Sequence, residues 1–554
     1  MILRSTKFNK LIKYIMKKKL LSLLFLAIPM LTFAQEKGLD QKIDEAFKPI
    51  SDFFSSVIFF PIYKSESIEI PFVLLLLVGS AAFFTLYFKF PNIFHFKTAI
   101  NVVRGKYDEL DHHSAGSDLA VDGDIKGTIK DESEEGEVTH FQALATAVSG
   151  TVGNGNIAGV ALAIALGGPG ATFWMVICGF LGMSTKFVEC TLGVQYRDVG
   201  EDGTVYGGPM YYISKGLKER GFEMLGKIAA VIFAVFCIGG SFGGGNAAQS
   251  NQATVVLKEL MGFESTGAGF WIGVVMAIVV GIIIIGGIKR IAQVTEKVVP
   301  FMAALYVLAC LYILGANFSL IDDAFALIFR EAFNPTAIGV GGFIGVLLVG
   351  FKRAAFSNEA GAGSASIAHS AVKTKYSASE GLVALLEPFI DTVLICTMTA
   401  LVIIIFNFGG DASGATVFQY GGDGAGAVMI GGESFEGAGI TSKAFAEYIP
   451  FSNVFLTIAV VLFAVSTMIS WSYYGLQSWK FLFGRGKAAD MAYKVLFLVF
   501  VIIGASASMK SIWDFSDAMI FAMVFPNMVG LYFLFPVVKK QLKRYTDAIK
   551  GVKA

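Results

Sequence analysis

Long apolar runs separated by short polar segments make up most of the chain beyond residue 70. An α-helix needs about 20 predominantly apolar residues to cross a bilayer, and each run is close to that length. The pattern therefore predicts an all-α polytopic membrane protein with about eleven transmembrane helices. The predicted spans are 70–90, 141–167, 170–190, 228–257, 268–288, 298–318, 336–356, 380–408, 450–479, 489–507 and 512–537.

The composition agrees with this class of protein. Of the 554 residues, 55% are hydrophobic and only 16% are charged, which is more apolar surface than a soluble domain can bury. The net charge is +1, and the lysines and arginines stand in short runs between apolar segments, so nucleic acid is not an expected partner. The five cysteines lie inside apolar segments with no CxxC pair, and we interpret them as packing residues.

The N-terminus has the features of an export signal. The basic KKK at 17–19 precedes the apolar LLSLLFLAIPMLTF, which is followed by the small residue Ala34. We predict that residues 1–34 form a cleavable signal peptide. The alternative is an uncleaved anchor, although the apolar core is short for a full span. After cleavage, residues 35–69 form an extracytoplasmic N-terminal segment.

Basic residues fall in alternate loops and predict the orientation. Cytoplasmic loops of membrane proteins are enriched in lysine and arginine. We predict that the protein lies in a bacterial inner (plasma) membrane. With the mature N-terminus outside, an odd number of spans places the basic tail 539–554 in the cytoplasm. The basic residues used are Lys89, Lys97, Arg104, Lys106, Lys215, Lys218, Arg220, Lys227, Lys289, Arg290, Lys297, Lys373, Lys375, Lys480, Arg485, Lys487, Lys539, Lys540, Lys543 and Arg544.

Two loops differ from the others in composition. The predicted cytoplasmic loop 91–139 contains an insertion at 107–139 that is rich in Asp, Glu, Gly and Ser, and we expect this insertion to be disordered. The predicted external loop 409–449 is glycine-rich and acidic. It is either a lid over a binding site or simply a flexible connection.

Two apolar runs are interrupted by glycine and polar residues, as GTVGNGNIAG at 150–159 and FSNEAGAGS at 356–364. Irregular backbone exposed to hydrocarbon costs several kcal/mol per unsatisfied group. Such a break is tolerated where it lines a cavity or where a ligand replaces the lost hydrogen bonds. The freed N–H groups favour an anion and the freed carbonyls favour a cation, and a free amino acid carries both charges.

The positions of the two breaks predict the architecture. Counted from Phe141, the broken helices are the first and sixth of ten spans, so they cross the membrane in opposite directions. We therefore predict two five-helix halves in inverted topology, 140–335 and 336–538, with the site between them and one extra helix at 70–90. The alternative is that these glycines serve only close helix packing.

Charged residues beside the second break allow two interpretations. Burying a charge in a transmembrane helix costs roughly 2.5–3.5 kcal/mol on insertion scales, so such charges are usually paired or functional. Arg353 and Glu359 either neutralise each other across the break, or Glu359 contacts a substrate or cation directly.

A pair of hydroxyl side chains predicts a cation site. Ser466 and Thr467 follow Phe463 by one helical turn, so two hydroxyls and the Phe463 carbonyl supply the oxygen ligands that sodium prefers. The alternative is that each hydroxyl bonds back to the carbonyl one turn earlier. Beside freed carbonyls near Thr151 and Asn154, we favour sodium.

The remaining polar residues support no enzyme or proton path. Gln249 either reaches a substrate or bridges two helices. Glu387 and Asp391 lie one turn apart, and we expect Glu387 to be solvated near a cytoplasmic end. His140 and His369 lie near cytoplasmic ends, and we expect no carboxylate cluster beside them, so a membrane-embedded enzyme is not favoured. A channel is not favoured either, because it does not need two opposed broken helices around a closed polar site.

Several long motifs resemble the alanine or glycine:cation symporter family, also called sodium:alanine symporters, and the resemblance extends from about residue 70 to 540. The motifs are TVGNGNIAGVALAIALGGPGATFW at 151–174, GGPMYYISKGL at 207–217, AAFSNEAGAGSASIAH at 354–369, EPFIDTVLICTMTALVI at 387–403 and WSYYG at 471–475.

The resemblance implies a leucine-transporter-type fold of two inverted five-helix repeats and sodium-coupled uptake of a small neutral amino acid, alanine or glycine. A proton-coupled or glutamine-preferring carrier is the alternative. No cofactor besides the coupling ion, and no obligatory protein partner, is expected. The implied substrate contacts are Thr151, Gly153, Asn154, Gly155, Asn156, Gly244, Gln249, Phe356, Ser357, Asn358 and Glu359. The implied sodium ligands are Thr151, Asn154, Phe463, Ser466 and Thr467.

The chain departs from the family pattern at two of these motifs. Asn154 stands where the family commonly has a threonine, as GTGN, next to both implied sites. Leu476 follows WSYYG where a glutamate is usual, so any role of that carboxylate is absent. The substrate range and the choice of cation are therefore left open.

Overall fold

The computed structural model describes residues 39–65, 68–111, 136–200, 203–263, 265, 267–333, 342–408, 416–421 and 426–553. The predicted signal peptide and residues 112–135 of the acidic insertion lie outside these ranges.

Long apolar helices dominate the described residues, which confirms the predicted helical membrane protein. Seven helical segments there are long and apolar enough to cross a membrane, and the broken pair α7 and α8 makes an eighth. These segments are α9 (Gly170–Gln195), α11 (Glu223–Phe242) with η4 (Gly243–Ala247) and α12 (Ala248–Met261), α14 (Gly287–Ala316), α18 (Ser377–Ala384) with α19 (Leu386–Pro388), η7 (Phe389–Cys396) and α20 (Thr397–Phe408), α22 (Ser452–Phe483), α23 (Lys487–Ser506) and α24 (Met509–Lys553).

Three further predicted spans correspond to shorter helices, α3 (Phe72–Tyr87), α13 (Ala268–Ile284) and α16 (Gly342–Asn358). The total of eleven spans stays a prediction. The remaining helices are α2 (Leu39–Ile58), α4 (Pro91–Phe94), α5 (Phe96–Val103), α6 (Asp108–Asp111), α7 (His140–Thr151), η3 (Gly155–Gly159), α8 (Val160–Gly167), α10 (Pro209–Glu219), η5 (Phe318–Leu320), α15 (Ile321–Phe333), α17 (Ala365–His369) and α21 (Ala438–Tyr448).

Three small antiparallel hairpins complete the described structure: β1 (Pro61–Lys64) with β2 (Glu69–Pro71), β3 (Asp198–Val199) with β4 (Val205–Tyr206), and β5 (Val428–Ile430) with β6 (Glu433–Phe435).

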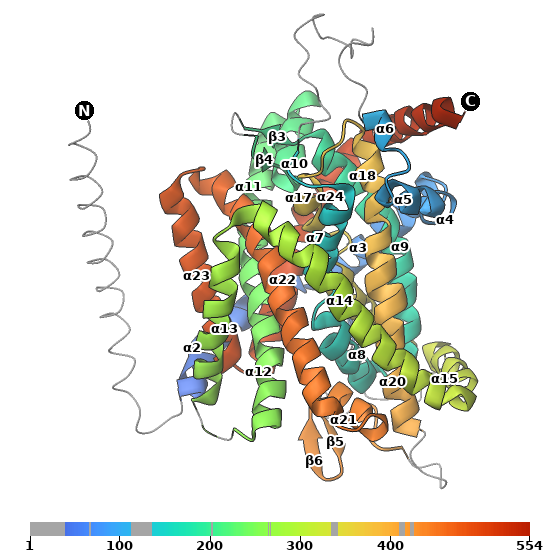
Figure 1. The fold of residues 1–554 in the computed structure, drawn as a ribbon, viewed down its shortest axis with the longest axis vertical. Helices are drawn as coiled ribbons and strands as arrows, with labels where there is room; N and C mark the ends of the chain where they lie inside the picture. Colours follow the sequence, from blue (N-terminus) through green and yellow to red (C-terminus); the bar gives the residue numbers. More distant parts are fainter. Residues whose placement is uncertain are drawn as a thin grey trace, which may run out of the picture.

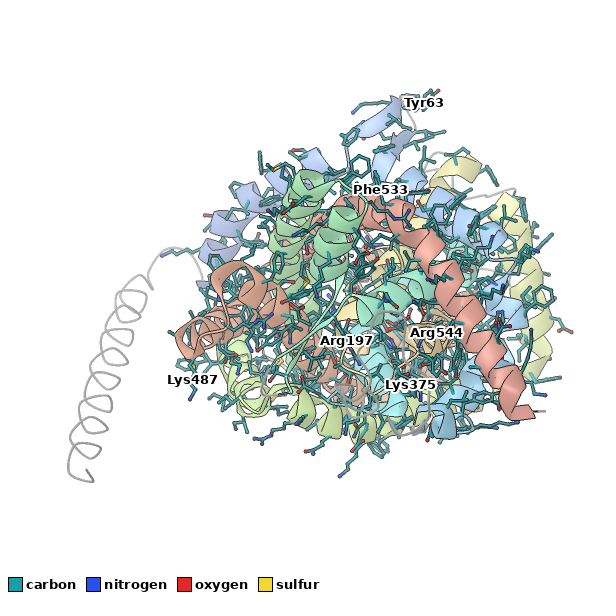
Figure 2. The ribbon with its side chains drawn as sticks, turned by 90° about the horizontal axis from the view of Figure 1, so that it is seen from above. Tyr63, Arg197, Lys375, Lys487, Phe533 and Arg544 are labelled. Atoms are coloured by element: carbon teal, nitrogen blue, oxygen red, sulfur yellow. The ribbon has the colours of Figure 1, made fainter. Side chains whose placement is uncertain are left out.

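The long helices run between two ends of the bundle (Figure 1). We call one the α18 end, where α10, α17 and α18 lie, and the other the α21 end, where α15, α21 and the β5–β6 hairpin lie. Figure 2 looks onto the α18 end, and Arg197, Lys375 and Arg544 are labelled on it. Lys375 and Arg544, which are among the basic residues that predicted the cytoplasmic side, therefore lie at this end of the molecule.

The two broken helices lie side by side and antiparallel. α7 packs against α17, whereas α8 packs against α16. The first half of each broken helix therefore contacts the second half of the other, so the two run in opposite directions, as predicted. The wider inverted symmetry of two five-helix halves stays a prediction.

Two segments predicted as loops contain helices. The segment 319–335 connects the predicted spans 298–318 and 336–356, and the prediction of a loop there is wrong, because α15 occupies most of it. Phe325, Phe329 and Phe333 recur every four residues on α15 and form an exposed stripe, which is the pattern of a helix lying against lipid. In the loop 409–449, α21 packs on η3, so the described part covers the first broken helix.

Close helix contacts at the centre depend on small residues. A Cβ on Gly245 would overlap the indole of the fully buried Trp471. We predict that Gly245→Ala destabilises the purified protein by about 1–3 kcal/mol, the usual cost of overpacking. Gly315→Ala is the matched control, because nothing lies within 4 Å of a Cβ there. Thermal unfolding in detergent measures both; equal midpoints would contradict the prediction.

Candidate substrate and cation site

The first break separates α7 from α8 by a bend of 50°. Backbone N–H groups freed at the break are satisfied by side chains. The N–H of Gly153 donates to Asn156 Oδ1 at 2.9 Å, and the N–H of Asn154 donates to Gln249 Oε1 at 3.0 Å. All of these residues are buried, so side-chain amides stand in for the missing helical carbonyls.

Gln249 connects this break to η4. Its Oε1 accepts from the backbone of Asn154, and its Nε2 donates to the carbonyl of Gly244 at 2.9 Å. The amide of Asn154 in turn donates to the carbonyl of Gln249 at 3.2 Å. Of the two sequence interpretations of Gln249, the structure shows the bridge between helices. Its contact with a substrate stays a prediction.

The second break lies between α16 and α17. Glu359, Gly361 and Gly363 have positive φ angles of 54°, 96° and 88°, which ends α16 abruptly. A Cβ on Gly363 would lie 2.7 Å from Pro209 Cγ, so this position needs glycine for space as well as for conformation. Asn358 Oδ1 accepts from the N–H of Ala360 at 3.0 Å and caps the freed backbone.

Asp391 joins the two breaks. Its carboxylate accepts from Asn156 Nδ2 at 2.7 Å, from the Ser357 hydroxyl at 2.8 Å and from the Thr392 hydroxyl at 2.6 Å. Asn156 belongs to the first broken helix and Ser357 to the second. The sequence showed Asp391 one turn from Glu387, but only the fold brings it to the breaks.

In the described part of the chain, only neutral donors hydrogen-bond the Asp391 carboxylate, and no lysine, arginine or histidine forms an ion pair with it. A buried carboxylate without a counter-charge is costly in a membrane and therefore favours a bound cation or a proton. The site thus offers a negative charge between the two breaks.

Three π-helical segments surround the breaks: η3, η4 and η7. They carry Asn156, Gly244 and Asp391 respectively. A π-helical turn leaves backbone carbonyls and N–H groups less regularly paired than in an α-helix and is common at functional sites. The polar residues of the site therefore lie on locally irregular backbone.

Thr467 lies against the first break. Its hydroxyl donates to the carbonyl of Ser149 at 3.0 Å. A Cβ on Gly153 would lie 2.5 Å from Oγ1 of Thr467. Ser466 instead donates back to the Phe463 carbonyl at 3.0 Å, while the Ser149 hydroxyl donates to the Ser466 carbonyl at 2.8 Å. Ser466 thus bonds to a carbonyl one turn earlier on its own helix, which is the alternative to a cation ligand. Thr467 instead bonds from α22 to α7.

Two oxygens of the predicted cation site have different surroundings. Asn154 Oδ1 is buried and has no hydrogen-bond partner in the described structure, although buried polar atoms normally have one. Thr151 Oγ1 lies 3.3 Å from the Ala147 carbonyl on its own helix. Asn154 and Thr467 therefore fit a cation or an ammonium group better than Thr151 and Ser466 do.

Phe356 forms the apolar wall of the site. A Cβ on Gly155 would lie 3.6 Å from its ring, and a Cβ on Gly244 would lie 3.5 Å from it and 2.5 Å from Ile520. The ring also stacks on Trp513 with a centroid distance of 4.8 Å. Two glycines thus face one aromatic ring.

A buried ion pair lies next to Phe356. Arg353 and Lys352 both pair with the buried Asp517, Lys352 at 3.0 Å, and the Arg353 guanidinium lies 5.5 Å from the Phe356 ring centroid. The hypothesis that Arg353 neutralises Glu359 is wrong, because a carboxylate from α24 takes the arginine. A cavity of about 200 Å³ at the α21 end is lined by Lys352, Arg353 and Asp517 together with Leu162, Leu166, Val349, Glu436, Met509, Lys510, Trp513 and Asp514.

Glu359 points to α22 instead. It accepts from Trp471 Nε1 at 3.0 Å and from the Ser364 hydroxyl. It is buried, and Lys186 is among the charges that act on it. Direct contact of Glu359 with a substrate or a cation stays a prediction.

Sequence reasoning missed a buried charged cluster toward the α18 end. Glu387 is completely buried and accepts from Lys186 at 2.9 Å, so the expectation that Glu387 is solvated is wrong. His140 and His369 both bond to Glu380, so the expectation that no carboxylate accompanies them is also wrong. Lys186 and Glu189, two charges deep in the apolar run 170–190, are the signal in the sequence that could have revealed it.

The architecture and the site define the class of protein. A helical membrane bundle with two antiparallel broken helices, a buried polar seat between them and a cavity toward one end is a membrane transporter. The sodium:alanine symporter family matches residues 59–554, and the chain belongs to that family. Its members are transporters rather than enzymes, and the chain is a multi-pass secondary amino-acid transporter.

Two relatives show how far the similarity extends. The chain is 38% identical over 482 residues to the sodium/alanine symporter AgcS of Methanococcus maripaludis, covering 87% of this chain and 95% of that protein. It is 32% identical to the probable sodium/glutamine symporter GlnT of Bacillus subtilis, covering 75% of this chain and 80% of that protein. Among solved structures, it is similar to MhsT in complex with L-phenylalanine, with 14% identity, 73% of this chain and 99% of that chain covered, and a TM-score of 0.48.

The role of Asp391 as the joint between the breaks generates a prediction. Asp391→Asn replaces two acceptor oxygens with one, so Asn156 and Ser357 can no longer both donate to the side chain of residue 391. Each unsatisfied buried donor costs about 1–3 kcal/mol. We expect a lower unfolding midpoint and loss of substrate uptake, whereas Asp547→Asn on the exposed end of α24 changes neither. An unchanged midpoint and uptake in Asp391→Asn would show that the joint is dispensable.

Proposed function

We propose that the chain imports a small neutral amino acid, alanine or glycine, together with sodium by alternating access around the two breaks. The α18 end faces the cytoplasm in this proposal, because Lys375 and Arg544 lie there. The leucine-transporter-type inverted repeat and the site residues named above are part of the proposal. A single net charge that moves inward down 100 mV supplies about 2.3 kcal/mol.

One observation carries the sodium proposal. Thr467 crosses from α22 to the carbonyl of Ser149 beside the first break, where the unpartnered Asn154 Oδ1 is also buried. Hydroxyl, amide and carbonyl oxygens are the ligands that a hard cation prefers. Sodium held there would tie α22 to the broken helix and stabilise its conformation.

The wall that faces the breaks supports a small substrate. Gly155, Gly244 and Phe356 approach one another closely, and Ile520 fills the space beside Gly244. A hydrogen or a methyl group fits such a seat, which supports glycine or alanine. A longer side chain would displace Phe356 or Ile520.

Two alternative hypotheses, one for the substrate and one for the coupling ion, have specific support. The similarity to GlnT supports glutamine as the substrate. The uncompensated Asp391 carboxylate and the buried histidines support a proton as the coupling ion.

The first test is uptake into proteoliposomes. Labelled alanine, glycine and glutamine are offered with sodium or proton gradients imposed separately. We expect sodium-dependent accumulation of alanine or glycine, and an apparent sodium affinity about tenfold weaker in Thr467→Ala, because one ligand oxygen is lost. Thr457→Ala, on the same helix α22 as Thr467, is the matched control, since the Thr457 hydroxyl bonds to the carbonyl of Val256 on α12 and not to the first break. Uptake that follows only the proton gradient would refute sodium coupling.

Substrate size gives a second prediction. Ile520→Ala removes the side chain that a Cβ at Gly244 would meet at 2.5 Å. We expect the ratio of glutamine to alanine uptake to rise about tenfold or more, since steric exclusion in an apolar pocket is worth roughly 1–3 kcal/mol. Ile512→Ala on the same helix α24 is the control. A ratio that stays at the wild-type value would place the size filter elsewhere.

A further inference from the structure

A buried chain of titratable side chains joins the two broken helices at the α18 end. His140 is the first residue of α7, and His369 is the last residue of α17. Each donates or shares a proton through Nδ1 with one oxygen of Glu380 on α18. Glu380 and His369 are fully buried, and His140 is 9% exposed. One carboxylate thus connects the first half of one broken helix to the second half of the other.

The next side chain in this buried series is Glu387, which faces His369 without a hydrogen bond between them. His369 Nε2 lies 3.7 Å from Glu387 Oε2, and neither atom has a hydrogen-bond partner in the described structure. The other oxygen of Glu387 accepts from Lys186. With a proton on Nδ1 alone, His369 presents the lone pair of Nε2 to a carboxylate, which is repulsive. A second proton on Nε2 turns that contact into a charge-assisted hydrogen bond.

The surrounding charges are mainly negative. α17 packs on α7, α9 and α22. The ionisable groups of these and the adjoining elements that act on the cluster are His140, Lys186, Glu189, Cys190, Glu359, Glu380, Glu387 and Tyr474. Four of them are carboxyl groups and one is a lysine. Two of the carboxyl groups, Glu380 and Glu387, contact His369 itself, so an imidazolium there lies between two acceptors.

The same place holds the backbone closure of the α18 end. Val138, just before α7, pairs with Val372, just after α17, and the N–H of Lys373 donates to the carbonyl of Val138 at 2.9 Å. Arg197 donates to the carbonyls of Ser370 at 2.9 Å and of Thr374 at 3.3 Å. Any opening between α7 and α17 must separate these pairs and the Glu380 bridge together.

We propose that His369, held between Glu380 and Glu387, is a proton-binding site that locks the two broken helices together at the α18 end. The bound proton bridges the two carboxylates through the imidazolium, and its release weakens the closure. Proton concentration at this end therefore sets how readily the end opens. The proposal rests on the proposed function only where it makes this opening a step of transport.

Hydrogen–deuterium exchange on the purified full-length protein tests the site without any transport. Wild type and His369→Gln are compared at the same pH, so the intrinsic pH dependence of exchange cancels. At about pH 5.5, where histidine is normally charged, we expect the amides of 137–138 and 371–373 to exchange about tenfold faster in H369Q. A charge-assisted hydrogen bond stabilises a closed conformation by roughly this factor. At about pH 10, where a histidine held between two carboxylates has released its proton, we expect the two proteins to agree.

His95→Gln is the matched control, because His95 lies between α4 and α5 outside the cluster, and we expect wild-type exchange in it at both pH values. Equal exchange of wild type and H369Q at acid pH overturns the proposal. A difference of the same size at both pH values also overturns it, since that result marks a structural role only. If H369Q does not fold, wild type alone decides: relative to the amides of α13, exchange at 371–373 must slow as the pH falls.

Uptake separates this site from the proposed function. If the purified protein accumulates alanine, we expect acid pH on the cytoplasmic side to slow uptake in wild type and not in H369Q. Acid that accelerates uptake through His369 would overturn the lock and identify a transported proton instead. If no amino acid is taken up at all, the proposed function fails, and the exchange experiment still decides the proton site.

Discussion

The need to satisfy backbone groups inside a membrane governs the whole arrangement. Two helices are interrupted at the centre of the bundle, and hydrocarbon offers no water to replace their lost hydrogen bonds. The replacements come from side-chain amides: Asn156 and Gln249 at the first break, and Asn358 and Asn527 at the second. Two of these amides belong to α12 and α24. Each break is therefore tied to helices outside the broken pair and cannot change conformation without moving them.

Buried carboxylates connect these elements at three levels, and each uses a different chemistry. Asp517 holds Arg353 and Lys352 toward the α21 end, Asp391 collects neutral donors between the breaks, and Glu380 bridges two imidazoles toward the α18 end. Removing one partner of a buried ion pair strongly destabilises the fold, whereas a single hydrogen bond from an amide or a hydroxyl contributes less free energy. The three levels therefore respond to different events, and one end can loosen while the other holds.

The sequence predicted the elements better than their contacts. Apolar runs and glycine clusters located the spans and both breaks, because these features are local. Pairings were not predictable: Arg353 and Glu359 are near in sequence but have separate partners, while Lys186 and Glu387 pair across 201 residues. Thr467 illustrates the same limit, since composition could not tell a bond within α22 from one to Ser149. A lysine buried in an apolar run indicates that a partner exists but not which residue it is.

The two ends of the bundle are closed to different degrees, and this difference bears on how a ligand acts. A cavity reaches Arg353 and Trp513 from the α21 end, whereas backbone pairing and the Glu380 bridge close the α18 end. A ligand shifts such an equilibrium only by binding one conformation better than the other. The unpartnered Asn154 oxygen and the uncompensated Asp391 charge are the groups with most to gain from a bound cation. Asn154 lies in the first break and Asp391 joins the two breaks, so a ligand that satisfies both groups changes the free energy of the segments that must move at both ends.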